Sequence, residues 1–324
     1  MAQYIHDGNI PKPLLDALID SDKEYAAEVK EFMSDKQHYH YATSVTSLNR
    51  PTQASELARR HGFEIYVHPL KDCWHSFMGN VIHFVLEKYA AKDPNYITEF
   101  RLGAEITVDG KQCYIHGKFD LYNKVTEKIQ DWKLTSGTNM MYPKTDFERQ
   151  LNVLRYILLR NGWKVKGMED VYLFPHLDKT KMNNPLYPKE HALVTQVEEI
   201  PINEVEEMIR NKIRSQLTEK DKPDKELTPC SNEERWVRDS SWNIYLRKKG
   251  GKKGEKQEFS SRAAFRAPTV KEIIRWRKEN GIPKEDSLYK EFKGEPKMCN
   301  YCKSSPFCHQ RLNEIMEQEN QPKE

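Results

Sequence analysis

Residues 113–121 read Cys-Tyr-Ile-His-Gly-Lys-Phe-Asp-Leu, and residues 128–134 read Lys-Ile-Gln-Asp-Trp-Lys-Leu. Both stretches have the pattern of β-strands, in which side chains alternate between the two faces of a sheet. By this spacing Asp131 and Lys133 share one face of the second strand. Asp120 joins them if the short connection makes the two strands pair antiparallel. The two stretches therefore predict a pair of carboxylates and an amine gathered on one sheet.

The surrounding sequence extends this sheet and adds helices. Tyr96 to Val108 predicts a third strand, and Asp109-Gly110 predicts the hairpin turn that joins it to the strand at 112–122. A polar helical segment is expected within 1–40, where Leu14, Leu15, Leu18 and Ile19 have helical spacing. Helices are also predicted over 52–62, 79–89, 146–160 and 204–217, and strands over 44–49 and 166–174. This order indicates an α/β fold with a mixed central β-sheet flanked by helices.

The composition is polar for a globular chain. Of the 324 residues, 37% are hydrophobic and 31% charged, and the net charge is +3. We expect no membrane contact and a cytoplasmic location, because no apolar run has the length of a membrane span and the first residues lack the features of a signal peptide. In that reducing compartment, the six cysteines are expected to bind metal or to be buried rather than to form disulfides.

The positive charge is concentrated in one part of the chain. Residues 229–312 contain 20 lysine and arginine residues against 11 acidic ones. We interpret this basic lobe as a surface that attracts a polyanion and guides it to an acidic metal site. A solvated lysine-rich surface explains the charge equally well. We divide the chain into a helical segment at 1–40, a core at 41–228, the basic lobe at 229–312 and an acidic tail at 313–324.

Two carboxylates and one amine on a sheet suit metal-assisted hydrolysis of a phosphodiester. Asp120 and Asp131 would bind Mg²⁺ or Mn²⁺, which favour oxygen ligands. Lys133 would position the attacking water and offset charge on the phosphate. The alternative is that all three are ordinary surface residues, because Asp-x-Lys taken alone is a common tripeptide.

Three cysteines near the C-terminus have metal-ligand spacing. Cys299, Cys302 and Cys308 lie in a short polar segment and require a fourth ligand, for which Cys230 is the first choice and Cys73 the second. The spacing accepts a zinc ion or an iron–sulfur cluster. We expect a structural site that fastens a lobe poor in apolar residues.

The order of these motifs resembles the PD-(D/E)XK nuclease superfamily in its RecB-like exonuclease branch, over roughly residues 44–312. The residues that carry the resemblance are Gly79-x-x-x-His83, Gly117-x-x-Asp120, Asp131-x-Lys133 and Gln150 on the following helix. The resemblance implies a restriction-endonuclease-like core. It also implies that the catalytic Mg²⁺ or Mn²⁺ is bound by His83, Asp120, Asp131 and the backbone carbonyl of Trp132.

The resemblance assigns further roles. Lys133 becomes the catalytic lysine and Gln150 a residue at the edge of the site. Without the family pattern, we would interpret His83 as a core histidine whose ring nitrogens are hydrogen-bonded. A tyrosine that the family often has four residues after the glutamine is replaced here by Leu154, so no role is assigned to Tyr156. The cysteines look like those of phage-encoded and CRISPR-associated members, which implies a 4Fe–4S cluster at Cys230, Cys299, Cys302 and Cys308.

We therefore expect a DNA nuclease of the exonuclease type that acts on single strands or duplex ends. The candidate DNA-binding residues lie in the basic lobe: Lys248, Lys249, Lys252, Lys253, Arg262 and Arg266. One alternative is a non-catalytic DNA-binding or recombination scaffold that keeps the fold. Another is a nuclease subunit that works beside a helicase partner, since the chain has no P-loop of its own.

Overall fold

The chain divides into two compact units. Unit 1 comprises Met1–Thr228 with Pro306–His309, and unit 2 comprises Pro229–Ser305 with Gln310–Glu324. The computed structural model describes residues 3–5, 16, 24–62, 67–142, 145–237, 241–247, 259–260, 262–292 and 294–319, the side chains of 3–5, 67–76, 292 and 317–319 excepted. Leu14, Leu15, Leu18, Ile19 and the basic tip at 250–254 lie outside these residues. The prediction of a helical segment over 1–40 is correct for residues 24–32 but wrong for Gln3–Ile5, which form a strand, and for residues 33–40, which form turns and bends.

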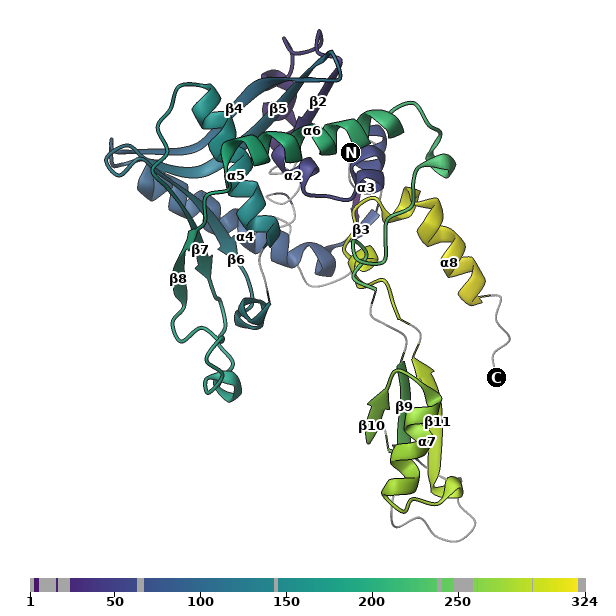
Figure 1. The fold of residues 1–324 in the computed structure, drawn as a ribbon. Coiled ribbons are helices and arrows are strands. Elements are labelled where there is room, and N and C mark those ends of the chain that lie inside the picture. The colour runs from purple at the N-terminus through teal and green to yellow at the C-terminus, as the bar shows by residue number, and fades with distance from the viewer. Residues whose placement is uncertain are drawn as a thin grey trace. The chain divides into compact units, whose positions relative to one another are not determined.

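A six-stranded mixed sheet forms the centre of unit 1. Its strands follow the order β2-β5-β6-β7-β8, and β4 pairs with the other edge of β5. The strands are β2 (Tyr41–Ser44), β4 (Tyr96–Val108), β5 (Lys111–Asn123), β6 (Lys128–Leu134), β7 (Gly167–Leu173) and β8 (Ala192–Val197). Figure 1 shows β6, β7 and β8 side by side. The pairing of β5 with β4 and β6 is antiparallel and that of β6 with β7 is parallel, so the predicted mixed α/β fold is confirmed.

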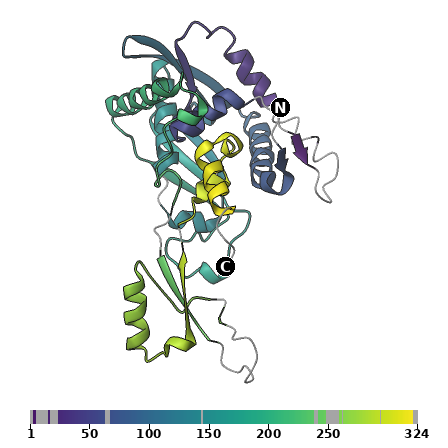
Figure 2. The same ribbon diagram turned by 90° about the vertical axis from the view of Figure 1, so that its right-hand side faces the viewer.

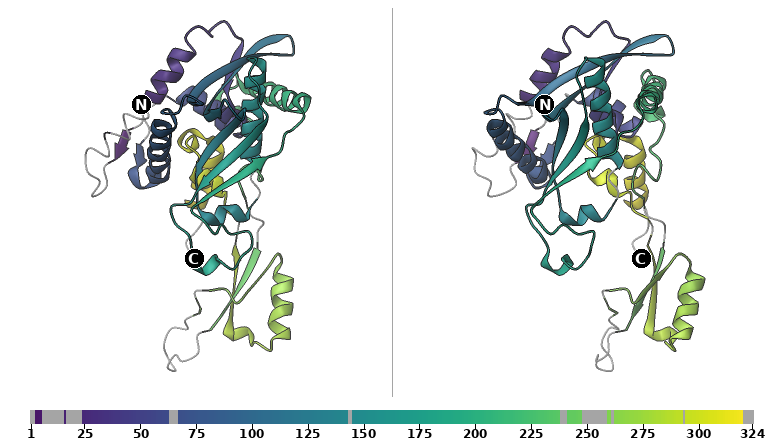
Figure 3. Two further views of the ribbon diagram at one scale, coloured as in Figure 1. Left: turned by 90° about the vertical axis from the view of Figure 1, so that its left-hand side faces the viewer. Right: turned by 60° about the vertical axis from the view of Figure 1, so that its left-hand side comes forward.

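Helices cover both faces of this sheet. They are α2 (Val45–Leu48), α3 (Thr52–His61), α4 (Leu70–Ala90), α5 (Thr145–Arg160) and α6 (Ile202–Glu219). Figure 3 shows α4 on one side of the sheet and α5 with α6 on the other. The main core lies on the α5 side, where Ile115 and Phe119 of β5 pack with Leu154 and Ile157 of α5. A small parallel pair of strands, β1 (Gln3–Ile5) and β3 (Val67–Pro69), also belongs to this unit.

Two glycines explain the geometry of β5. Gly110 has a φ of +76° and follows Asp109 with a φ of +49°, so the turn between β4 and β5 has two left-handed residues, as the Asp-Gly pair predicted. At Gly117 a Cβ atom would lie 2.6 Å from Val45 Cγ2 and 2.7 Å from Leu154 Cδ2. The glycine of Gly117-x-x-Asp120 therefore lets α2 and α5 pack directly on the strand.

One edge of β5 is shared between two strands. β2 pairs with residues 113–116, whereas β6 pairs with residues 121–123. Residues 117–120 lie between these two pairings. The ladder between β5 and β6 ends at Leu121 and Gln130, one residue before Asp120 and Asp131. The split places both aspartates at the point where β6 leaves β5.

The prediction of a strand and turn over 44–49 is wrong. Strand β2 ends at Ser44, and the short helix α2 begins there because the side chain of Ser44 accepts a hydrogen bond from the backbone N–H of Ser47. Serine favours such caps, and this preference overrides the β-propensity of Val45. The helix predicted to begin at Gly79 is a part of the longer α4.

Unit 2 contains a three-stranded antiparallel sheet and two helices. The strands run in the order β10 (Phe265–Ala267), β9 (Ser241–Leu246) and β11 (Ser287–Phe292), and the helices are α7 (Val270–Glu279) and α8 (His309–Glu319). Figure 2 shows α7 beside the three strands. Ile244, Ala267 and Ile273 form a small buried core. Among the described residues of both units, none of the helices combines the length and apolar character needed to cross a membrane.

Candidate metal and nuclease site

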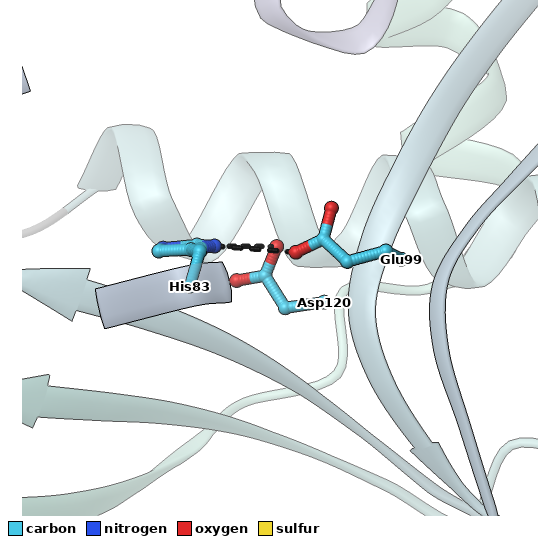
Figure 4. Close-up of side chains that lie close together, drawn as sticks. All are labelled: His83, Glu99 and Asp120. Carbon is cyan, nitrogen blue, oxygen red and sulfur yellow. Dashed lines mark hydrogen bonds and ion pairs between the residues drawn. The ribbon is translucent and has the colours of Figure 1, made fainter. Parts of the chain in front are cut away.

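Three side chains from three different elements meet beside the centre of the sheet. His83 comes from α4, Glu99 from β4 and Asp120 from β5, as Figure 4 shows. His83 Nδ1 lies 3.3 Å from Glu99 Oε1 and 3.6 Å from Asp120 Oδ1. One ligand atom of each residue lies within 4.8 Å of the other two. This is the one group of three or more histidine, cysteine, aspartate or glutamate side chains with that spacing in the described part of the chain.

The main chain of Trp132 holds two of these side chains in place. Its N–H donates a hydrogen bond of 2.5 Å to Asp120 Oδ2, and its carbonyl oxygen lies 2.9 Å from His83 Nε2. Because β6 no longer pairs with β5 here, this N–H bonds to a carboxylate instead of a ladder carbonyl. The strand split thus supplies backbone groups to the site.

A second cluster is formed around Asp131 and Lys133, which lie on either side of Trp132 in β6. The Asp131 carboxylate forms an ion pair with Lys133 and accepts a hydrogen bond of 3.1 Å from Gln150 Nε2 on α5. The Lys133 ammonium also lies 4.9 Å from the ring centroid of Phe147. The Gln150 amide therefore points at Asp131, a candidate active-site residue. This contact explains why a polar residue lies on the apolar face of α5.

The electrostatics couple the two clusters. Burial and the nearby charge of Asp131 raise the pKa of Asp120 to about 7. Burial by itself would lower the pKa of His83, but the carboxylates of Glu99 and Asp120 outweigh burial and raise it to about 8. Burial likewise opposes the charge on Lys133, yet Asp131 raises its pKa. A site with several carboxylates and a histidine drawn towards its charged form is suited to a cation.

Asp170 extends the row of acidic residues onto β7. It pairs with Asp131 in the parallel ladder, is 1% exposed, and accepts a hydrogen bond of 3.1 Å from the hydroxyl of Tyr172. Burial and the charge of Asp131 raise the pKa of Asp170 to about 6. The sequence did not reveal this neighbour, because nothing in the sequence fixes the register of two parallel strands joined by a helix.

The structure departs from the expected ligand set in one respect. His83 and Asp120 meet as expected, but the third member of their group is Glu99 and not Asp131. A signal for Glu99 was present in the sequence. The Asp109-Gly110 turn pairs Val108 with Lys111, and counting back along this hairpin places Glu99 opposite Asp120.

Tyr156 has no place in this site. Its hydroxyl lies 3.3 Å from Glu206 Oε2 on α6, and the side chain is 2% exposed. Leu154, which occupies the position of the family's tyrosine, belongs to the hydrophobic core.

The cysteines of unit 2 lie on neighbouring segments. Cys230 exchanges two hydrogen bonds with Gln310 of α8, at 3.0 and 3.1 Å. Arg235, five residues later, accepts through its carbonyl from the N–H of Met298 at 3.0 Å. The Met298–Arg235 bond brings together the segments that carry Cys299 and Cys230.

Cys308 belongs to unit 1, where its thiol lies 3.7 Å from Gln53 Oε1 and its neighbour Phe307 stacks on His61. The side chain of Cys73 lies outside the described residues. Within the described residues no cluster of four cysteines is found, and none of the cysteines forms a disulfide. The iron–sulfur or zinc site stays a prediction. Cys113 is buried in β5, as expected.

Two of the predicted DNA-binding residues can be placed. Arg262 is exposed, and Arg266 Nε donates to Asn243 Oδ1 at 2.9 Å on β9. Trp276 stacks on Phe265 with ring centroids 5.0 Å apart, and Trp242 packs against the same small core. Lys248, Lys249, Lys252 and Lys253 lie outside the described residues.

Comparisons with known proteins identify no family. No family model and no curated protein matches the chain. A solved structure titled "Crystal structure of SSO0001" is similar at 16% sequence identity with a TM-score of 0.45, over 65% of this chain and 89% of that one. Such a likeness carries nothing about function, so the family membership implied by the motifs remains a hypothesis.

Proposed function

We propose that the protein is a metal-dependent deoxyribonuclease that hydrolyses phosphodiester bonds at DNA ends or in single strands, within the cytoplasm, in recombination, replication or repair. The observation that carries the proposal is the position of Lys133. It pairs with Asp131 on a strand whose next backbone groups hold Asp120 and His83. Carboxylates, an imidazole and a lysine thus converge where β6 leaves β5.

The donor set fits Mg²⁺ or Mn²⁺. Carboxylate oxygens from Glu99 and Asp120 and a ring nitrogen of His83 are close enough to share an ion. When bound, such an ion polarises the phosphate and neutralises its charge. The family pattern would add Asp131, whose carboxylate contacts Lys133 and Gln150 in the structure.

The chain's own residues would do the remaining work. The Lys133 ammonium, kept charged by Asp131, can donate hydrogen bonds to the phosphate and to the attacking water. Gln150 fixes Asp131 and thereby the lysine. In the reaction a water molecule gives up a proton to the solvent as its oxygen forms the new bond to phosphorus, the bond to one ester oxygen breaks, and that oxygen takes up a proton.

The test is degradation of end-labelled single- and double-stranded DNA with Mg²⁺, Mn²⁺ or a chelator. We expect Lys133→Met and Asp131→Asn to slow cleavage by about 10²- to 10³-fold, the usual effect of removing a group that stabilises the transition state. Lys128→Met is the matched control, because Lys128 lies on the same strand but pairs with Glu169 at 2.7 Å. Cleavage at the wild-type rate by Lys133→Met and Asp131→Asn would refute the assigned centre.

The same assay separates the alternatives. DNA binding without cleavage by the wild type under all metal conditions would indicate a scaffold. Cleavage that begins only when a helicase is added would indicate a nuclease subunit. Iron and zinc analysis of the purified protein tests the four-cysteine site separately.

A further inference from the structure

The geometry around His83 defines which of its nitrogens can face a cation. Nε2 lies 2.9 Å from the carbonyl oxygen of Trp132, which can only accept, so Nε2 carries the hydrogen of this bond. In the neutral ring the lone pair is then on Nδ1. This atom faces the carboxylates of Glu99 and Asp120, at 3.3 and 3.6 Å. Histidine ligands of metal ions commonly donate their other N–H to a carbonyl or carboxylate in this manner.

Glu99 presents one oxygen to this point and anchors the other. Its Oε2 pairs with the Lys118 ammonium at 2.6 Å, which leaves Oε1 directed at His83. The residue lies between the paired positions Thr98 and Phe100, opposite Asp120, and its φ is +47°. The side chain is only 12% exposed. The ion pair with Lys118 thus holds the carboxylate of Glu99 in place.

Asp131 is held in another direction. Its Oδ1 accepts from Gln150 and its Oδ2 pairs with Lys133, and it is not a member of the group formed by His83, Glu99 and Asp120. The Trp132 carbonyl is likewise engaged, by His83. Two of the four ligands expected from the sequence therefore have partners of their own.

We propose that Glu99 is a ligand of the divalent cation together with His83 Nδ1 and Asp120, and that the Trp132 carbonyl orients His83 instead of binding the ion. This inference deepens the proposed function and rests on it for the reaction that the ion serves. A set of one imidazole nitrogen and two carboxylate oxygens favours Mn²⁺ over Mg²⁺, because Mg²⁺ prefers oxygen ligands alone. We therefore expect the site to bind Mn²⁺ more tightly than Mg²⁺.

The test is Mn²⁺ binding by the full-length chain, measured by calorimetry and by electron paramagnetic resonance. Glu99→Gln keeps the size of the side chain and removes its charge. We expect it to weaken Mn²⁺ binding by about 10- to 100-fold or more, since even partners outside the ligand set contribute that much. Glu28→Gln is the matched control, because Glu28 pairs with the same Lys118 at 3.5 Å and with Arg101 at 3.0 Å but lies outside the group.

Nitrogen coupling in the pulsed resonance spectrum of bound Mn²⁺ gives a second readout. It should be present in the wild type and in Glu28→Gln and absent in His83→Asn. Thermal unfolding of each variant shows whether it is folded.

The outcomes separate the inference from the proposed function. Unchanged Mn²⁺ affinity in folded Glu99→Gln, or equal loss in Glu28→Gln, overturns the ligand assignment even if the wild type cleaves DNA. Loss of affinity in Glu99→Gln alone supports the assignment even if the wild type cleaves no DNA. Absence of Mn²⁺ binding by the wild type overturns it.

Discussion

Arg101 Nη1 lies 3.4 Å from Nδ1 of His116, and both side chains, from β4 and β5, are buried beside the ring of Phe32. Burial and the positive charge of Arg101 lower the pKa of His116 to about 4. The unfolded chain has an ordinary histidine pKa of about 6.5. Between these two values the unfolded state binds more protons than the folded state, so the protein loses stability as the pH falls.

This difference predicts a pH-dependent variant. Replacing His116 by Asn should remove a contribution of up to about 1.4 kcal/mol per pH unit between pH 6.5 and 4. Urea unfolding at pH 6.5, 5.5 and 4.5 measures it, with the wild-type free energy of unfolding falling more steeply than that of His116→Asn. Parallel pH profiles for the two proteins would show that His116 titrates normally.

Asp120 is expected to have separable structural and chemical roles. The buried carboxylate accepts the N–H of Trp132, and an asparagine can do the same through its side-chain oxygen. Asp120→Ala leaves this N–H without a partner, which costs about 1–3 kcal/mol. Asp120→Asn and Asp120→Ala should both lose DNA cleavage, but Asp120→Ala should unfold at the lower temperature. Equal melting temperatures would mean that the bond to Trp132 does not stabilise the fold.

Gly117 is predicted to tolerate no larger side chain. The Cβ of an alanine would press on Val45 and Leu154, and such overpacking typically costs about 1–3 kcal/mol. Gly79→Ala is the control, because no described atom lies within 4 Å of the corresponding Cβ and alanine favours helix by about 1 kcal/mol. Chemical denaturation should show Gly117→Ala destabilised and Gly79→Ala unchanged or more stable. The reverse order would contradict the packing of α2 and α5 on β5.

Cys302→Ser tests the predicted metal site in unit 2. If the cysteines bind iron–sulfur or zinc, this variant should lose the metal found in the wild type and unfold at a lower temperature. Iron and zinc analysis with thermal unfolding measures both effects. Cys113→Ser is a control for thiol loss elsewhere, since Cys113 is buried in β5 of unit 1. Wild-type protein without either metal would refute the site.

Much of the fold follows from local sequence patterns. The strand Tyr96–Val108, the Asp109-Gly110 turn and the strand Lys128–Leu134 have the predicted bounds, because alternation and turn chemistry act over a few residues. The helix 52–62 was also predictable, since it ends at Gly62. At 44–49 the side-chain cap of Ser44 decided in favour of a helix.

The site was less predictable than the fold. Motif spacing was enough to indicate Asp131, Lys133 and Gln150, and both Lys133 and Gln150 do contact Asp131. Glu99 could have been placed opposite Asp120 by counting back along the Asp109-Gly110 hairpin, but its left-handed backbone depends on tertiary structure. The position of Asp170 depends on the register of two parallel strands. The division of the aspartates between two clusters follows from the split of β6 from β5, which no local pattern encodes.

The hydrogen bonds that Trp132 makes with His83 and Asp120 involve only its main chain, whereas its ring meets the His83 ring edge-on with the centroids 6.0 Å apart. A substitution there changes the side chain but leaves both hydrogen bonds possible, as long as the residue is not proline, which has no N–H. The two hydrogen bonds at the middle position of Asp-x-Lys therefore constrain its main chain, while packing and the ring contact with His83 constrain its side chain.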